Sequence, residues 1–230
     1  MRVTRIADPM LRSSLLIGGL VLYGVSMAMM ITSGLGLDPW DVFHEGLGHR
    51  LPLSFGAVTA VTGVVVLLAW IPLRERPGIG TVANVVVIAI TVDGALKLMP
   101  PADGHVGRAT LLIGGVVLNG LATASYISAG LGAGPRDGLM TGIVARTGLS
   151  VRLVRTGIEA TVLAAGWILG GTAGVGTVFY ALAIGPLVQF FLHIVPARFL
   201  ADRAGNDHSS GDFSPGDNSE PADRMPTDTP

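Results

Sequence analysis

Six long apolar stretches, separated by short polar segments, dominate the hydropathy pattern of the chain. Each is about as long as the roughly 20 helical residues needed to cross a hydrocarbon core of about 30 Å. The first is longer than the apolar part of a typical signal peptide and closely resembles the fourth, so we expect it to be retained. The pattern predicts six transmembrane helices, at residues 13–32, 54–73, 81–99, 109–128, 150–169 and 177–195.

The chain also matches itself at a spacing of 96 residues without any gap. Glycines, prolines and acids recur at this spacing across a whole unit, which indicates a duplication. The matched positions include Gly34, Gly36, Pro39 and Asp41, which pair with Gly130, Gly132, Pro135 and Asp137. Each copy holds three predicted spans, so the second copy must enter the membrane from the opposite side. We therefore expect an all-α membrane protein of six transmembrane helices, built as two inverted three-helix repeats.

The duplication and the composition together set the expected domain boundaries. Half of the residues are hydrophobic, 13% are charged and the mean hydropathy is +0.60, which excludes a soluble globular domain. The last 30 residues hold seven acidic side chains and two arginines, with too little apolar surface to offset the entropy of ordering. The expected units are a cytoplasmic N-terminus (1–11), repeat 1 (12–100), a linker (101–106), repeat 2 (107–196) and a disordered acidic cytoplasmic tail (197–230).

Basic residues predict the orientation of the spans. If the N-terminus starts in the cytoplasm, 12 of the 15 basic residues, Arg136 among them, fall in cytoplasmic segments. Only Arg50, Lys97 and Arg108 fall on the opposite side. By the positive-inside rule we expect a multi-pass protein of the bacterial plasma (inner) membrane with both termini in the cytoplasm.

Both repeats carry the pattern GxGxxPxD between their first and second spans, as GLGLDPWD at 34–41 and GLGAGPRD at 130–137. Glycine permits positive φ, proline suits the first position of a new helix, and the aspartate two residues later can accept bonds from free amides. The pattern predicts a helix break and a short helix in each copy. That helix either lies at the membrane surface or is re-entrant and lines a cavity. Because an aspartate occupies each positive helix end, an anionic solute is not favoured.

With these two motifs, and with the GIGT and GVGT turns at 78–81 and 174–177, the chain resembles the bacterial YczE/YyaS/YitT-type integral membrane proteins, whose biochemical function is not established. The resemblance covers residues 12–196. It implies a plasma-membrane protein of a kind sometimes described as a permease. It brings no catalytic residues.

Polar side chains inside the predicted spans are candidates for contact with a solute, because polar groups that face lipid are costly. At the 96-residue spacing Tyr23 pairs with Asn119, and Asn84 pairs with Tyr180, so each copy supplies one tyrosine and one asparagine. Hydrogen bonds between helices are the alternative role for all four.

Charged side chains inside the predicted spans have partners close in sequence. Arg155 precedes Glu159 by one helical turn, and Asp93 precedes Lys97 by the same distance. We expect both pairs to interact, with a proton or substrate role for Glu159 left open. The hypothetical substrate-binding residues are Tyr23, Asp41, Asn84, Asn119, Asp137, Glu159 and Tyr180.

No pattern in the chain indicates catalysis or a cofactor. Cysteine is absent, which removes thiolate metal sites and cysteine nucleophiles. Lys97 is the only lysine and follows no glycine-rich phosphate loop, and the spacing of His44 and His49 does not fit a zinc protease. We expect no enzyme activity, no catalytic residues, no metal and no cofactor. The arginines flank spans, so we expect no nucleic-acid partner.

Two functions remain open at this point. Inverted repeats and broken helices are typical of small-solute permeases and secondary transporters, whose site lies at the repeat interface. The alternative is a non-transporting membrane protein that binds a partner protein or lipid. Expected partners are thus the lipid bilayer and an unknown small solute. Gly24 with Ala28, and their counterparts Gly120 with Ala124, suit close helix packing within the bundle or in a homo-oligomer.

Overall fold

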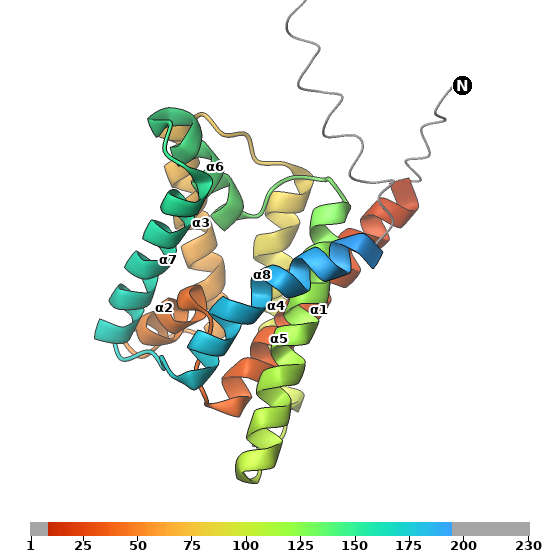
Figure 1. Ribbon diagram of the computed structural model, residues 1–230, viewed down its shortest axis with the longest axis vertical. Coiled ribbons are helices and arrows are strands. Elements are labelled where there is room, and N and C mark those ends of the chain that lie inside the picture. Colours follow the sequence, from red (N-terminus) through yellow and green to blue (C-terminus); the bar gives the residue numbers. More distant parts are fainter. Residues whose placement is uncertain (1–8, 195–230) are drawn as a thin grey trace, which may run out of the picture.

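The computed structural model describes residues 9–194, and this part of the chain is helical throughout, without β-strands. The predictions for residues 1–8 and 195–230, including the acidic tail, lie outside the described residues. Figure 1 shows the arrangement of the helices. They are α1 (Pro9–Ser33), α2 (Pro39–Gly48), α3 (Phe55–Leu73), α4 (Ile79–Leu98), α5 (Gly104–Ser128), α6 (Pro135–Thr147), α7 (Val151–Ile168) and α8 (Val175–Ile194).

Six of these helices coincide with the predicted spans, and the two short ones, α2 and α6, follow the glycine-rich motifs. Five helices, α1, α3, α4, α5 and α8, are long and apolar enough to cross a membrane. The remaining long helix, α7, has 18 residues but carries Arg152, Arg155 and Glu159. Multiple membrane crossings are therefore supported, and a sixth crossing by α7 depends on how its charges are accommodated.

Helix starts recur at the spacing of the repeat. The Ser54 hydroxyl accepts a hydrogen bond from Ala57 N at the start of α3, and the Ser150 hydroxyl accepts one from Leu153 N at the start of α7. Serine favours this position because its oxygen satisfies an amide that has no partner within the helix. The two caps are 96 residues apart.

The helices form two groups, which Figure 1 shows on either side of the molecule. In one group α1 and α5 lie side by side, with α4 packed on α1 and α8 packed on α5. In the other group α2 packs on α7 and α6 packs on α3. Each short helix therefore packs on a long helix of the other sequence copy.

Two arginines join the ends of α1 and α5 in the same way. Arg12 Nε donates to Ala129 O at 2.9 Å, and Arg108 Nε donates to Ser33 O at 2.6 Å. In each case the second guanidinium nitrogen donates to the carbonyl of the following glycine. These carbonyls lie at helix C-termini, where a cation is favourable. The two contacts are related by the 96-residue spacing.

Glycines let the helices approach closely, as the small-residue pattern predicts. A Cβ atom on Gly24 would lie 2.7 Å from the Thr91 side chain of α4. A Cβ atom on Gly120 would lie 2.9 Å from the Leu187 side chain of α8. Both distances are shorter than real Cβ contacts, so these positions require glycine.

The two copies differ where the second long helix meets the third. On α3 a Cβ atom at Gly56 would lie 2.1 Å from Ala89 O of α4, so these helices are in close contact. The counterparts of Gly56 and Gly63 on α7 are Arg152 and Glu159, and α7 has no comparable packing with α8. The molecule is therefore closed between α3 and α4 but not between α7 and α8.

The predicted pairing of Asp93 with Lys97 is wrong. The Asp93 carboxylate accepts hydrogen bonds from the Ser54 hydroxyl and from Gly56 N, where it caps the start of α3. Free amides at a helix N-terminus are better partners for a carboxylate than an exposed lysine one turn away. Asp93 therefore fastens α3 to α4.

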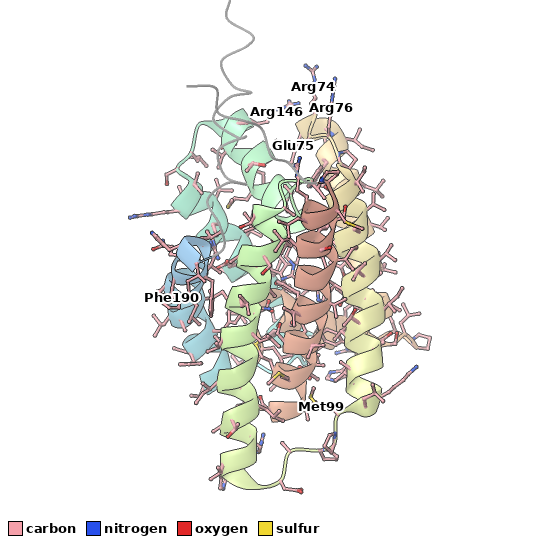
Figure 2. All side chains as sticks on the ribbon, turned by 90° about the vertical axis from the view of Figure 1, so that its right-hand side faces the viewer. Arg74, Glu75, Arg76, Met99, Arg146 and Phe190 are labelled. Carbon is pink, nitrogen blue, oxygen red and sulfur yellow. The ribbon has the colours of Figure 1, made fainter. Side chains whose placement is uncertain are left out.

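The outer faces of the long helices suit a lipid environment. Val82, Val86 and Ile90 follow one another along α4 at four-residue spacing and are 56%, 48% and 69% exposed. Such a stripe would be unfavourable in water. Figure 2 shows Arg74, Arg76 and Arg146 at one end of the bundle, away from Met99 near the other end.

Candidate functional site

The breaks between α1 and α2, and between α5 and α6, have the same backbone conformation. Gly34 and Gly36 have φ values of 59° and 119°, and their counterparts Gly130 and Gly132 have values of 62° and 130°. Only glycine adopts these conformations without strain. A proline then opens each short helix, Pro39 in α2 and Pro135 in α6.

Each break runs back along the start of a long helix from the other copy. Gly80 N of α4 donates to Leu131 O at 2.8 Å, and Gly176 N of α8 donates to Leu35 O at 2.8 Å. Deeper along α4, the Thr81 hydroxyl donates to Ala133 O at 2.7 Å. The backbone of each break is thus fixed by amides that have no partner in their own helix.

The cap of α2 differs from the predicted one. Asp38, rather than Asp41, accepts hydrogen bonds from the amides of Trp40 and Asp41, at 2.9 and 3.2 Å. An N-cap side chain lies just outside the helix and can turn back to the free amides, whereas Asp41 is already inside the first turn.

The start of α6 has no side-chain cap, because Gly134 stands at the position equivalent to Asp38. Asp137, which was expected to act as a cap, instead accepts a hydrogen bond from the Tyr126 hydroxyl at 2.8 Å. Its carboxylate therefore lies against α5.

One cavity of about 320 Å³ is lined by both breaks and by residues of every long helix. The breaks contribute Asp38, Pro39 and Trp40 from one copy and Gly134 to Asp137 from the other. Five of the seven predicted binding residues line it, and these are Tyr23, Asn84, Asp137, Glu159 and Tyr180. The other two, Asp41 and Asn119, lie behind the lining and bind residues that form it.

The tyrosines and asparagines of the two copies behave differently. Asn119 is fully buried, donates to the Ser26 hydroxyl at 2.9 Å and accepts from the Tyr180 hydroxyl at 3.1 Å. This pair makes the interhelical hydrogen bonds that were the alternative to solute contact. The side chains of Tyr23 and Asn84 line the cavity and make no hydrogen bond within the described residues. Of these four side chains, Tyr23 and Asn84 are therefore the two available to a solute.

Arg136 links the two breaks across the cavity. Its guanidinium nitrogens lie 3.6 Å from Asp38 Oδ1 and 3.6 Å from Asp41 Oδ1. The guanidinium carbon lies 5.0 Å from the centre of the Trp40 ring, a cation–π distance. Arg136, which was counted among the basic residues of the cytoplasmic segments, thus also binds two carboxylates of the other break.

Sequence reasoning missed Arg136, Asp38 and Trp40 as site residues. Within the two motifs Trp40 is replaced by Arg136, and Asp38 is replaced by Gly134. These differences were the available signal, because a cation in one copy and an extra carboxylate in the other can pair when the copies meet.

Three buried polar side-chain atoms have no hydrogen-bond partner within the described residues: Asp38 Oδ2, Asp41 Oδ2 and Thr62 Oγ1. Asp38 and Thr62 also line the cavity. Asp38 lies in the break between α1 and α2, outside the spans. Burial and, second, the neighbouring Asp41 carboxylate raise the pKa of Asp38, and Arg136 only partly offsets this shift. Such unpaired buried groups are costly unless something else satisfies them.

The histidine and acidic side chains of α2 contact different parts of the molecule. His44 Nδ1 lies 3.1 Å from Asp41 Oδ1, and burial, then Arg136, lower the pKa of His44. Glu45 instead accepts a hydrogen bond from Thr172 N in the loop before α8. Among residues 9–194, no group of three or more metal-binding side chains converges.

The side of the cavity between α7 and α8 carries charged groups. Arg155 Nε donates to Glu159 Oε1 at 2.9 Å, and the two side chains are 56% and 38% exposed. Both line the cavity, as does Gln189 on α8. Since α7 does not pack along α8, we identify this side as the mouth of the cavity. The i,i+4 pairing of Arg155 and Glu159 is the one expected from their spacing.

Comparison with known proteins places the chain among uncharacterised membrane proteins. An uncharacterized protein of Haemophilus influenzae is 39% identical over 182 residues, which cover 79% of this chain and 84% of the relative. The uncharacterized membrane protein YczE of Bacillus subtilis is 35% identical, covering 79% and 86%. YyaS of the same organism is 26% identical, covering 80% and 93%. No solved structure matches. Residues 10–193 match a family of unknown function (DUF6198), and the chain thus belongs to this YczE-type family of membrane proteins.

Proposed function

We propose that this protein is a small-solute permease or secondary transporter whose binding site is the cavity between the two breaks. The observation that carries the proposal is that the breaks of both copies, far apart in sequence, line one cavity with Arg136 between them. A purely structural helix break would need neither a shared cavity nor unpaired polar groups facing it. Discontinuous helices around a central site are a common design of transporters.

The proposed architecture is six membrane spans arranged as two inverted repeats. Its support is the reciprocal contact of Arg12 and Arg108 with the ends of α5 and α1, together with the matched glycine contacts. In this arrangement α2 and α6 are re-entrant, because their first turns meet at Arg136 although they belong to opposite sides. An interfacial position for both helices would keep these first turns apart.

The proposed orientation has both termini in the cytoplasm of a bacterial cell, with the mouth of the cavity in the cytoplasmic half of the bilayer. Arg74, Arg76 and Arg146 lie together at one end of the bundle, as the positive-inside rule requires of a cytoplasmic face. Arg155 and Glu159 lie in the half of α7 that is nearer this end. On the opposite side, α2 packs tightly on the last turns of α7.

Transport by reconstituted protein tests the proposal. The full chain in proteoliposomes is offered radiolabelled amines, neutral polyols and carboxylates, under an imposed proton or sodium gradient and without one. We expect uptake of at least one class above that of empty vesicles. We expect Asp137→Asn to reduce the uptake, because Asp137 lines the cavity, whereas Asp103→Asn, an exposed residue outside it, has no effect.

Failure of all three solute classes, with correctly folded protein, contradicts transport. A chain that binds a solute or a lipid without moving it across the bilayer is instead a non-transporting binding protein. Gel filtration of each variant separates a lost site from a lost fold.

A further inference from the structure

The charge of the cavity is not balanced. Among residues 9–194, Arg136 is the one arginine or lysine paired with Asp38 and Asp41, so two carboxylates share a single guanidinium. At the mouth, Arg155 and Glu159 neutralise each other. With its carboxylates ionised, the cavity therefore has an excess of negative charge, to which the Asp137 carboxylate adds.

Part of the excess charge lies on a side chain that lines the cavity. Asp38 is 2% exposed, its Oδ1 binds the start of α2, and its Oδ2 has no partner within the described residues. Thr62 of α3, 7% exposed, also offers an unpaired oxygen. Both residues line the cavity. Unpaired acceptors call for a ligand that donates hydrogen bonds.

The rest of the lining is apolar and aromatic. Tyr23 and Tyr126 meet edge to face, with ring centroids 6.3 Å apart. Aliphatic side chains cover most of the remaining walls, and these are Val66, Val85, Ile88, Ile127, Ile158, Ile184 and Val188. Such walls suit an apolar body and, through the faces of the aromatic rings, a cation.

We infer that the cavity binds an organic amine, with its ammonium group at the Asp38 carboxylate and its apolar body among the tyrosines and aliphatic side chains. This inference rests on the proposed function, since it names the solute class of the same site. An ammonium group provides up to three donors for the unpaired oxygens and balances the extra carboxylate.

An anion fits the cavity less well. The first turn of α6 has no side-chain cap, and a free helix N-terminus attracts anions. However, Asp137 lies in that same first turn, and Arg136 is already engaged by two carboxylates. An anionic ligand would add to a charge that is already in excess.

Three probes of similar shape test the charge preference. They are 2-phenylethylamine, which is cationic at neutral pH, 2-phenylethanol, which is neutral, and 3-phenylpropanoate, which is anionic. Calorimetric titration of the purified full chain in detergent, corrected with empty micelles, measures binding of each. We expect saturable binding of the amine, at least tenfold weaker binding of the alcohol and no binding of the carboxylate. Equal binding of amine and alcohol, preference for the carboxylate, or no binding of any probe overturns the inference.

Two variants locate the ammonium group. Asp38→Asn should weaken amine binding by about tenfold or more, the loss typical of a hydrogen bond to a charged group, and should abolish the preference over the alcohol. Thr62→Val, which keeps the volume of the side chain, should weaken binding of the amine severalfold and should retain the preference for the amine over the alcohol. Asp103→Asn is the matched control and should bind like the parent protein. Unchanged amine binding by Asp38→Asn and Thr62→Val overturns the assignment.

The binding experiment and the transport assay can succeed or fail independently. Selective amine binding without uptake supports the solute class and contradicts the permease. Uptake restricted to neutral or anionic solutes supports the permease and contradicts the solute class.

Discussion

At the scale of single residues, Arg136 is the most consequential side chain of the protein. It reaches from α6 to the start of α2 and is the cation shared by Asp38 and Asp41. Removing one partner of a buried ionic cluster leaves charge uncompensated, at a cost of about 3–5 kcal/mol. Arg136→Gln should therefore lower the free energy of unfolding by about that amount, as measured by thermal or denaturant unfolding in detergent.

Arg146 provides the matched control on the same helix. Its guanidinium is exposed and donates to the carbonyl of Pro72, so Arg146→Gln should cost about 1 kcal/mol or less. Adding Asp38→Asn and Asp41→Asn to Arg136→Gln should restore much of the loss, because the uncompensated charge is then gone. Equal effects of the two arginine substitutions would show that Arg136 does not compensate the charge of the buried carboxylates.

The residues of this cluster also mark the limit of prediction from sequence. Glycines and prolines of the breaks are predictable because the backbone conformation they permit is a local property. The partners of Arg136 depend on how each break is positioned along a long helix of the other copy. That position is a property of the assembled bundle and not of the local sequence. A comparison of the two copies that looks for identical residues overlooks Trp40 and Arg136. These two positions correspond in the repeats but hold different residues, and it is this difference that allows a cation–π contact between them.

At the scale of helices, the contact between α2 and α7 depends on glycine. A Cβ atom on Gly166 would lie 2.4 Å from Phe43 N, a backbone atom that cannot rotate away. Overpacking of this kind typically costs about 1–3 kcal/mol. Gly166→Ala should therefore destabilise the protein by about that amount, measured by thermal unfolding in detergent.

Gly157 lies on the same helix and has open space around its Cα atom. Gly157→Ala should be neutral or stabilising by up to about 1 kcal/mol, because alanine has the higher helix propensity. If both alanine variants were equally stable, α2 and α7 would not be in the close contact described.

Element boundaries followed from hydropathy, whereas the packing of elements did not. The long helices begin and end near the predicted positions because length and apolar content are set by the bilayer. The exchange of α2 and α6 between copies leaves no trace in the hydropathy of either helix. One difference in packing does have a sequence signal. Gly56 and Gly63 allow α3 to pack closely on α4, whereas their counterparts Arg152 and Glu159 stand on α7, which does not pack along α8. The signal is visible only when the two copies are compared position by position.

At the scale of the whole molecule, the twofold relation between copies predicts matched effects. Arg12 and Arg108 each donate to two carbonyls at the end of the other copy's first helix. Arg12→Ala and Arg108→Ala should each lower the free energy of unfolding by about 1–3 kcal/mol, since a hydrogen bond to a charged group is worth about that much. Arg50→Ala, at an exposed arginine outside both contacts, should cost less than about 0.5 kcal/mol. A large loss from only one of the first two would contradict the twofold relation.

The proposed topology depends on α7, the one long helix with three charged residues. Arg155 and Glu159 face the cavity and pair with each other, so their cost in the membrane is reduced.

The chain has no cysteine, which allows single-cysteine labelling without a background. In intact cells an impermeant maleimide should label Ala173→Cys, after α7, but should reach Thr147→Cys, before α7, only once the membrane is permeabilised. His49→Cys should match the first and Glu75→Cys the second, because α2 and the α3–α4 turn mark the two sides. Labelling of Thr147→Cys and Ala173→Cys from the same side would mean that α7 does not cross, and an inverted pair of three-span repeats would then be impossible.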